Sequence, residues 1–387
     1  MEKNLNILII QTAFVGDIAL TVFFANEIKQ MFPSATVHFI STKIGCEILK
    51  CFGFIDNPIV FDKRKSHKSF IKIKKFANEI NSNFSKNSKC QEIAGQAHNT
   101  GNCHTAQLNC HSALDAESPD NKIEKFDYIF ALHRSFRTAI LTKFLNAKNK
   151  IGFDKNSLSF LLSKKIQYKK NQHEVQRNRN CLTIFENYNE IFDYENLQNS
   201  IVSNFKNSDN LETIKDFTTE KKKYILVAAG SVWATKRWLK EYFAELCKKI
   251  ISDLKIDVYL IGSDEEKEIC DFISRESKAI SLAGKTTIPQ ILELVRNSLL
   301  VITNDSAPTH FASIFNIPTV TIYGATSPSF GFYPLAENSK IIEPQNLFCH
   351  PCAIHGGPNC PQKNFDCMKN IKPEMVFEEV KKMLNFT

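Results

Sequence analysis

Short apolar runs alternate with helical stretches through most of this chain of 387 residues, and this alternation restricts the fold more than any other feature. Leu5–Ile10 is a continuous apolar run, as expected for a strand that is buried on both faces of a sheet. Ile18–Met31 follows, with large apolar residues spaced four, four and three apart, which is typical of a helix. Strands that alternate with helices predict right-handed crossovers and a parallel sheet, and therefore the α/β class.

The same alternation continues in both halves of the chain. In the first half it predicts further strands and helices over residues 36–40, 44–52, 59–61, 70–80 and 128–132. In the second half it predicts strands over 224–229, 257–261, 299–302 and 318–323, and helices over 239–250, 265–274, 288–296, 308–315 and 373–384.

The length of the chain predicts two domains, because 387 residues exceed what one typical hydrophobic core holds together. A polar stretch at 204–222 reads as a linker between them. We therefore expect a Rossmann-like domain over 1–203, a second one over 223–387 that ends in a helix, and a cleft between the two.

Residues 85–124 interrupt the alternation, because they are rich in polar residues and show neither a helical nor a strand period. The segment His111–Pro119 resembles peptides translated from dispersed bacterial repeat elements, so we interpret the stretch as a disordered surface insertion. The alternative is a metal-binding loop, although the spacing of its candidate ligands matches no common zinc module. These ligands are Cys103, His104, Cys110 and His111.

The segment Thr303–His310 carries the strongest local signal for a binding site. It joins an apolar strand to a helix whose start Ser306 can cap through its hydroxyl, and Pro308 suits the first helical turn. Backbone N–H groups and the helix dipole at such an end attract phosphate. A second strand and the small-residue turn Gly324–Pro328 follow, which indicates a nucleotide site at the carboxyl edge of a parallel sheet.

Two further loops lie at strand-to-helix junctions. Gly230–Trp238 offers hydroxyl groups and the cations Lys236 and Arg237, which suit a diphosphate, although a solvated basic turn is the alternative. In the first loop, Gly16 permits close approach of a ligand and Asp17 lies at a helix start, where an N-cap is the alternative role.

These motifs together resemble glycosyltransferase family 9, the bacterial ADP-heptose:lipopolysaccharide heptosyltransferases, over nearly the whole chain apart from the insertion. The resemblance rests on Gly16–Asp17, Gly230–Trp238, Asp305–His310 and Tyr323–Pro328 in this order. The C-terminal cysteines Cys349, Cys352, Cys360 and Cys367, followed by Lys372–Val376, are most similar to the heptosyltransferase II branch.

The resemblance implies a GT-B fold in which the C-terminal domain binds the donor and the N-terminal domain binds the acceptor. It implies that Asp17 is the general base and that Lys236 neutralises the leaving diphosphate, with inversion at the anomeric carbon and with no metal or other cofactor. The implied donor-binding residues are Gly230, Ser231, Thr235, Glu265, Asp305, Ser306, Ala307 and His310.

The chain departs from the family pattern at Ala307, where members usually have glycine, and at Ala228–Gly230, where a Pro–Gly turn is frequent. The acidic donor-binding residue is expected near 264–266, and we place it at Glu265. For the acceptor we expect Gly16, Arg134 and Arg137, with His133 beside them, although a basic helix start exposed to water is the alternative for this group.

The four C-terminal cysteines contain one zinc-type pair, Cys349 and Cys352, but lack the second close pair of a zinc ribbon. A metal there is possible in chemical terms, with His350 and His355 nearby, but we expect a reduced packing motif and no metal. The remaining cysteines lie in or beside apolar helices and are expected in the core, namely Cys46, Cys51, Cys181, Cys247 and Cys270.

The formal net charge of +8 favours anionic partners such as nucleotides, phosphorylated sugars or an acidic membrane surface, and no motif indicates nucleic acid. No signal peptide and no run of about 18 apolar residues is present, so we expect a cytoplasmic protein, in contact with the inner face of the membrane at most.

We therefore predict an inverting transferase that moves heptose from ADP-heptose to the anionic, lipid-linked inner core of lipopolysaccharide. The alternatives are a transferase for another nucleotide sugar, a sugar-nucleotide epimerase of the same architecture, and a non-catalytic nucleotide-sugar-binding protein.

Overall fold

The computed structural model describes residues 4–99, 125–186, 188, 193–206 and 223–386, and for 86–99 it describes the backbone alone. These residues group into two compact units. The first holds residues 1–12, 32–43 and 56–168, and the second holds residues 13–31, 44–55 and 169–387.

The first unit is built on a sheet of six parallel strands in the order β3-β2-β1-β4-β5-β6. The central strand β1 is almost completely buried because both of its faces are covered, as its continuous apolar sequence predicts. The strands are β1 Asn6–Ile10, β2 Thr36–Ser41, β3 Asn57–Val60, β4 Phe126–Ala131, β5 Ala147–Phe153 and β6 Lys164–Ile166.

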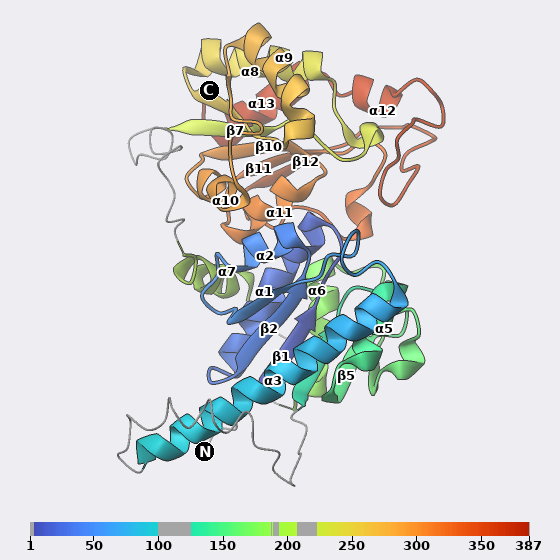
Figure 1. Cartoon of the computed structure of the whole chain (residues 1–387). Helices are drawn as coiled ribbons and strands as arrows, with labels where there is room; N and C mark the ends of the chain where they lie inside the picture. The colour runs from blue at the N-terminus through green and yellow to red at the C-terminus, as the bar shows by residue number, and fades with distance from the viewer. Residues whose placement is uncertain (1–3, 100–124, 187, 189–192, 207–222, 387) are drawn as a thin grey trace. The chain divides into compact units, whose positions relative to one another are not determined.

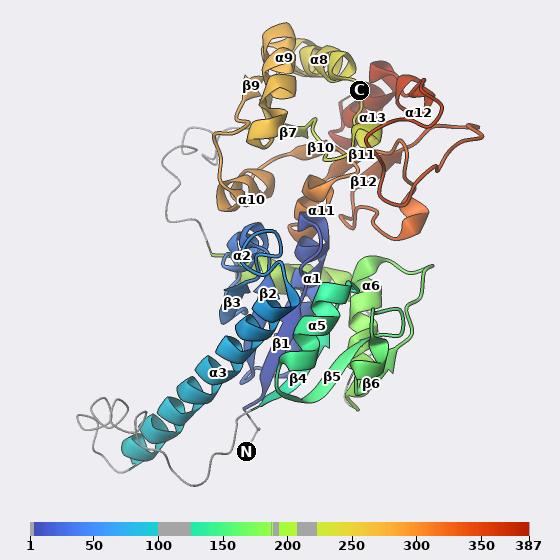
Figure 2. The same ribbon diagram turned by 45° about the vertical axis from the view of Figure 1, so that its right-hand side comes forward.

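Helices α3 (Phe70–Asn99) and α5 (Phe136–Phe144) pack together against one face of this sheet (Figure 2). The buried side of α3 presents Ile73, Phe76 and Ile80 at helical spacing, and these side chains join the apolar residues of β1 and β4 in one core. The loop after α5 and β5 holds the short 3-10 turn η1, Ser159–Leu161.

Helix α3 differs from the prediction, which ended it at Ile80 and began an unstructured insertion at residue 85. The helix continues to Asn99: Phe84, four residues after Ile80, packs into the same core, and extending a helix whose first turns are already formed needs no new nucleation. The rest of the predicted insertion, residues 100–124, and the candidate metal ligands in it lie outside the described residues.

The second unit is built on another sheet of six parallel strands, in the order β12-β11-β10-β7-β8-β9. When the strands of each sheet are numbered from one to six along the chain, both sheets have the order 3-2-1-4-5-6. In each sheet the first and fourth strands are therefore neighbours. The strands are β7 Tyr224–Ala228, β8 Asp257–Leu260, β9 Ile280–Ser281, β10 Leu300–Asn304, β11 Thr319–Ile322 and β12 Ser339–Ile342.

Helices cover both faces of the second sheet (Figure 1). One face carries α8 (Lys240–Lys249), α9 (Lys267–Ser277) and α13 (Pro373–Met383), whose apolar sides form a core with β7, β8 and β10. The other face carries α10 (Ile288–Arg296) and α11 (Ala307–Ile314).

Several other helices of this unit, among them α1, α2, α6 and α7, precede its sheet in the chain. Helix α1 (Val15–Met31) packs along α11 and contacts α6 and α7. Most of α1 is buried all round its axis, since apolar residues occupy nearly every position from Ile18 to Ile28. The others are α2 Lys43–Leu49, α6 Glu174–Arg179, α7 Tyr194–Ser203 and α12 Asp366–Lys369, with the shorter turns η2 Asn180–Ile184, η4 Ala234–Lys236, η5 Ile250–Leu254, η6 Asp264–Glu266 and η7 Pro328–Phe330.

The α/β class with two parallel sheets is confirmed. The predicted domain boundaries stay a prediction, because the compact units follow contacts between helices rather than position along the chain. Among the described helices, none combines the length and apolar character that a bilayer crossing requires.

One prediction concerns His38 on β2, whose ring lies edge-on to Phe84 and Phe126 and whose Nε2 finds no hydrogen-bond partner among the described residues. Burial lowers the pKa of His38 to about 4, against the opposing charge of Asp56. The unfolded chain therefore binds a proton at His38 between about pH 6.5 and 4 that the folded chain does not, and stability falls as the pH falls through this range.

We expect acidification from pH 7 to pH 5 to lower the free energy of unfolding by about 2 kcal/mol through His38 alone. A His38→Gln variant should not show this part of the loss. Urea unfolding of the two proteins at both pH values measures it. The exposed His355→Gln variant serves as control, and an identical acid shift in His38→Gln and in the parent protein would contradict the assignment.

Candidate functional site

The order of the second sheet brings two loops together at one edge. Strands β7 and β10 are neighbours, and after their carboxyl ends the chain continues to helices on opposite faces of the sheet. Parallel sheets bind ligands at the edge where two such loops separate. Asn304, at the end of β10, joins the two loops. Its side chain donates to the carbonyl oxygens of Ala229 and Gly230 and accepts from the N–H of Trp238.

The charged centre of this edge is an ion pair between Lys236 and Asp305. The Lys236 Nζ lies 2.7 Å from Oδ2 of Asp305, and the two side chains are 14% and 8% exposed. The hydroxyl of Thr326, from the loop after β11, donates to the same carboxylate oxygen at 2.6 Å. The loops after β7, β10 and β11 therefore meet at this ion pair, at one edge of the sheet.

The start of α11 lies directly beside Asp305. Pro308 occupies the first turn of α11, as predicted. The predicted capping role of the Ser306 hydroxyl is wrong: Ser306 holds the N-cap position, but its extended backbone places the hydroxyl 3.2 Å from that of Thr303 instead of on a helix N–H. The adjacent Ala307 begins the helix and is half-buried.

His310, one turn into α11, is buried and presses against the first loop of the chain. A Cβ atom on Gly16 would lie 2.7 Å from Cδ2 of His310, so the close approach of these two segments requires glycine. Burial and the positive charge of Lys236 lower the pKa of His310 to about 3, which keeps the ring neutral near pH 7. Its Nδ1 finds no hydrogen-bond partner in the described part of the chain.

Asp17 follows Gly16 and is half-buried. It lies in the first turn of α1, two residues inside the start at Val15, so it does not occupy the N-cap position that the alternative reading gave it. Asp17 lies in the same compact unit as Lys236, and the contact of Gly16 with His310 brings its segment next to α11, which begins at Ala307.

The other predicted donor-binding residues differ in their surroundings. Thr235 is buried and exchanges hydrogen bonds with Gly357, while the carbonyl oxygen of Ser231 accepts from Arg237. Glu265 is exposed, but the next residue, Glu266, lies against Gly230, where a Cβ atom would come within 1.9 Å of its Oε1. Glu266 also accepts from the N–H of Ser263 at 2.9 Å. The acid beside the Gly230 loop is therefore Glu266.

A C-terminal loop covers the stem of Lys236. Gly356, with a φ of +79°, packs so closely that a Cβ atom there would lie 2.8 Å from Cγ of Lys236. The next residue before it, His355, has its ring 6.2 Å from that of Phe14 in the first loop. This loop thus helps to fix both Lys236 and the segment that leads into Asp17.

The four C-terminal cysteines line one cavity of about 50 Å³ on the side of this loop. Burial and the three neighbouring thiols raise the pKa of Cys367 to about 11. Within the described residues, no group of three His, Cys, Asp or Glu side chains is arranged to hold a metal ion. Whether these thiols bind metal stays untested, whereas the predicted burial of Cys46, Cys51, Cys181, Cys247 and Cys270 is confirmed.

Of the predicted acceptor-binding residues, Arg134 and Arg137 belong to the first unit, whereas Gly16 belongs to the second. The hydroxyl of Thr12, after β1, lies 2.8 Å from Nδ1 of His133, after β4, because these strands are neighbours. Burial and the nearby cations Lys63 and Arg134 lower the pKa of His133 to about 4. Arg134 is exposed and stacks over the ring of Tyr168 at 4.0 Å, and Arg137 is exposed in the first turn of α5.

The structure therefore brings together Lys236, Asp305, His310, Gly16 and Asp17 within one unit. The sequence analysis missed the contact of Thr326 with Asp305 and the close approach of His310 to Gly16. Each contact joins residues that are far apart in the chain. The one signal in the sequence was that all four residues lie in the motifs singled out for the binding site.

Comparison with protein-family models matches residues 122–359 to glycosyltransferase family 9 (heptosyltransferase). Lipooligosaccharide heptosyltransferase 2 of Campylobacter jejuni is 30% identical over 268 residues, which cover 68% of this chain and 77% of that protein. Lipopolysaccharide heptosyltransferase 2 of Escherichia coli is 31% identical over 155 residues, which cover 38% of this chain and 43% of that protein.

Solved structures show the same fold at lower identity. The family 9 glycosyltransferase of Veillonella parvula superposes with a TM-score of 0.74 at 18% identity, covering 100% of this chain and 99% of that one. The ADP-heptose lipopolysaccharide heptosyltransferase II of Escherichia coli superposes with a TM-score of 0.65, also at 18% identity, covering 98% and 99%.

The contact between Gly16 and His310 can be tested by Gly16→Ala. Alanine normally stabilises a helix relative to glycine by about 1 kcal/mol, but here its methyl group overlaps a buried ring that has little room to move. We expect a net loss of about 1–3 kcal/mol in stability, measured as a lower unfolding midpoint.

Gly53→Ala is the matched control, because its new Cβ would meet Lys206 Cε at 3.4 Å and the two oxygens of Asn204 at 3.5 and 3.7 Å, all ordinary contact distances. If Gly16→Ala is as stable as the parent protein, His310 does not limit the space at this position.

Proposed function

The chain belongs to glycosyltransferase family 9, and on that premise we propose that it moves heptose from ADP-heptose to the inner core of lipopolysaccharide with inversion of configuration. It is a glycosyltransferase by its family. The names of its relatives, which include lipooligosaccharide and lipopolysaccharide heptosyltransferase 2, support the heptosyl donor and the core acceptor.

The observation that carries the proposal is the buried ion pair between Lys236 and Asp305 at the start of α11. A diphosphate that enters beside this pair meets an ammonium group and the positive end of a helix dipole together. Asp305 holds the ammonium group, and the Thr326 hydroxyl holds Asp305, before the donor arrives, so little reorganisation is needed when charge develops on the leaving group.

In the proposed reaction, Asp17 accepts the proton of the acceptor hydroxyl. The hydroxyl oxygen forms a bond to the anomeric carbon of heptose from the side opposite ADP, and the bond between that carbon and the diphosphate oxygen breaks. ADP departs with the bonding electron pair, and Lys236 neutralises the charge it carries. One displacement at one carbon inverts its configuration, and a positioned base typically contributes about 10²–10⁴ in rate.

The other side chains of this edge are assigned to holding the donor. Among the described residues, the buried Nδ1 of His310 has no hydrogen-bond partner, and it suits a hydroxyl or phosphate oxygen of the donor. Ser231, Thr235, Ser306 and Ala307 border the same loops. Glu265 stays the sequence-based assignment for the acidic donor contact, while the position of Glu266 against Gly230 favours Glu266 for that contact.

The acceptor is proposed to meet the cations Arg134 and Arg137, since inner-core lipopolysaccharide is anionic and both side chains are exposed. No cofactor is required in this scheme, because fixed cations and a helix dipole stand where a metal would otherwise act. The cytoplasmic location at the inner face of the membrane remains a prediction. The family match favours transfer over the epimerase and the non-catalytic alternatives.

Asp17→Asn tests the base. The amide keeps the shape of the side chain but cannot take a proton, so we expect the rate of heptose transfer to fall by about 10²–10⁴ while the dissociation constant for ADP-heptose changes little. Both are measured on purified protein, by product formation and by protection of the protein from heat. Other nucleotide sugars in the heat-protection assay identify the donor.

Glu195→Gln removes an exposed acid from the first turn of α7 and is the matched control, expected to transfer at the parent rate. An Asp17→Asn variant with normal turnover would exclude Asp17 as the base.

Thr326→Val tests the arrangement that holds Lys236. Valine matches threonine in shape but leaves Oδ2 of Asp305 without its hydroxyl donor, a loss of about 1.5–3 kcal/mol for a hydrogen bond to a charged group. We expect kcat/KM to fall roughly tenfold or more, with Thr326→Ser restoring most of it. Equal kinetics for the valine and serine variants would show that the hydroxyl has no part in positioning the ion pair.

A further inference from the structure

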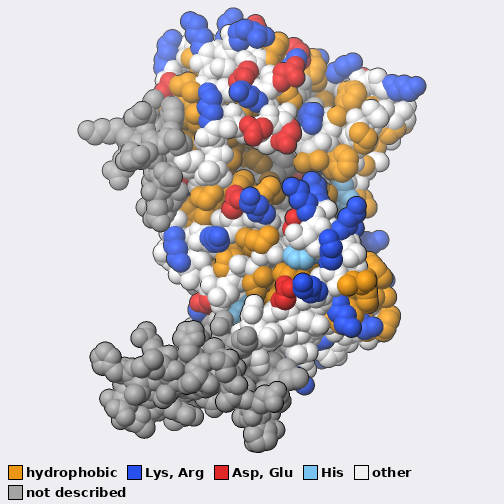
Figure 3. Space-filling view, in the orientation of Figure 1, with side chains coloured by type: hydrophobic (Ala, Val, Ile, Leu, Met, Phe, Trp, Pro, Cys, Tyr) orange, Lys and Arg blue, Asp and Glu red, His pale blue; other side chains and the backbone are white. Residues whose placement is uncertain are grey.

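Three loops of the second unit each leave a large apolar side chain exposed near the candidate site. Phe14, in the first loop, is 54% exposed, Val232, in the loop after β7, is 74% exposed, and Ile354, in the C-terminal loop of residues 349–357, is 63% exposed. Figure 3 shows apolar side chains at the surface on the side of this unit that carries α12 and the loop before it. One exposed apolar side chain is ordinary, but several on loops that meet indicate a binding surface.

The C-terminal loop is held on both sides of its exposed part. The N–H groups of Cys352 and Ala353 donate to the carbonyl oxygen of Ala325 at 2.9 and 3.2 Å. On the other side, the N–H of Gly357 donates to the hydroxyl of Thr235 at 2.8 Å. The residues between these anchors include the exposed His355, whose backbone is therefore fixed before any ligand binds.

His355 and Phe14 form a contact between the C-terminal loop and the first loop. Their ring centroids lie 6.2 Å apart and the ring planes are inclined by 45°, within the range of aromatic contacts. The carbonyl oxygen of Phe14 accepts from the N–H of Ile18 at 3.2 Å, so its backbone is fixed at the start of α1. About half of the Phe14 side chain still faces water, which leaves part of its ring available to a ligand.

This pair of rings joins the segment of the proposed base to that of the proposed cation. Phe14 precedes Asp17 by three residues, and His355 directly precedes Gly356, which packs against the stem of Lys236. In the proposed displacement, the sugar that is transferred lies between the attacking hydroxyl and the departing diphosphate. A sugar ring therefore passes close to the segments that carry Phe14 and His355.

We propose that Phe14 is a specificity-determining residue whose ring, with His355 beside it, packs against the C–H face of a sugar ring during transfer. Sugars carry their hydroxyl groups around the ring and C–H groups on its faces, so an aromatic ring contacts the face while the hydroxyls remain free for hydrogen bonds. The sugar is the donor heptose or the accepting sugar of the core, which share this chemistry. The inference deepens the proposed function and rests on it.

Phe14→Ala tests the contact in steady-state kinetics, with both substrates varied. We expect the KM for one of them to rise about 3–10-fold while kcat changes little, because the ring supplies binding and no chemistry. A higher KM for ADP-heptose assigns the ring to the donor sugar, and a higher KM for the acceptor assigns it to the core sugar. Affinity for ADP, measured by heat protection, should stay at the parent value, because ADP lacks the transferred sugar. Phe14→Tyr keeps the ring and should behave like the parent protein.

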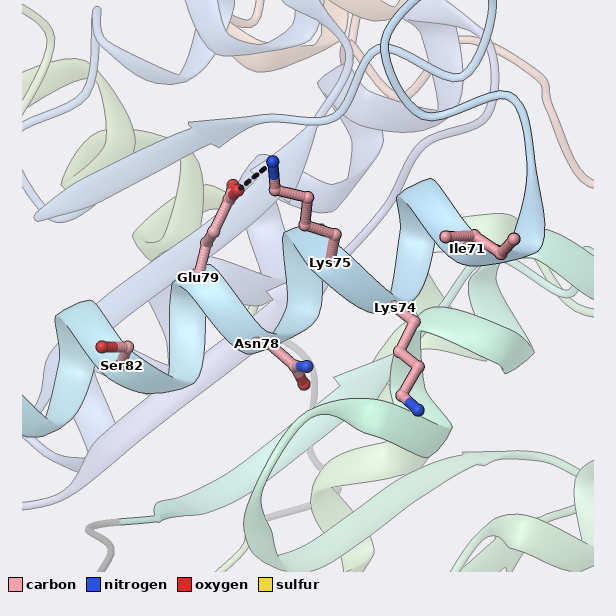
Figure 4. A pocket seen from close by; sticks show the side chains of 6 residues that line it. All are labelled: Ile71, Lys74, Lys75, Asn78, Glu79 and Ser82. Carbon is pink, nitrogen blue, oxygen red and sulfur yellow. Dashed lines mark ion pairs between the residues drawn. The ribbon is translucent and has the colours of Figure 1, made fainter.

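Ile71→Ala is the control, since it also removes an exposed apolar side chain. Ile71 is 78% exposed on the outer side of α3 in the first unit, where it borders a shallow hollow of about 440 Å³ (Figure 4). It should leave both KM values unchanged, and unfolding midpoints show whether all variants fold.

Two results would overturn the role of Phe14 alone: unchanged KM values in an active Phe14→Ala protein, or an equal loss of affinity for ADP and ADP-heptose. The second would place the ring on the nucleotide or in the shaping of the loop. A parent protein that transfers no heptose would overturn the proposed function and this inference together, so the two failures can be told apart.

Discussion

The ion pair between Lys236 and Asp305 is the interaction on which the candidate site depends. Both groups are largely buried, and removing one partner of such a pair commonly costs about 3–5 kcal/mol because the other charge stays buried alone. The pair therefore holds the loops after β7 and β10 in one arrangement, and the Thr326 hydroxyl adds the loop after β11 to it. An enzyme that must stabilise a departing diphosphate benefits from such a cation, since its orientation is established before the substrate arrives.

A second constraint is the neutral, buried His310. Its ring lies between the charge of Lys236 and the backbone of Gly16, and a protonated ring would suffer both burial and repulsion. The neutral ring allows α1 to approach α11 closely, and this approach positions Asp17. The proposed base and the proposed cation thus share one supporting side chain, which links the geometry of proton removal to that of the leaving group.

Much of the fold could be predicted from local sequence. Strands such as β1 and β7 are short apolar runs, and α10 has the predicted bounds because Thr287 and Gln290 mark its start. Two strands with weaker signals were missed. Strand β5 begins with polar residues that hide its apolar end, and β9 has two residues, too few to show a period. The length of α3 was underestimated, because its apolar spacing continues only one step beyond Ile80, to Phe84, and the polar residues after that show no helical period.

The sequence by itself determined the alternation of strands and helices, the motif order that indicates the family, and the loops that hold the candidate site. It could do so because apolar periodicity and turn residues act over a few positions. Tertiary structure alone decided that Glu266 rather than Glu265 meets Gly230, that the Ser306 hydroxyl turns to Thr303, and that Thr326 reaches Asp305. These contacts depend on which strands become neighbours and on how closely two backbones approach, and neither is encoded in any single stretch of the chain.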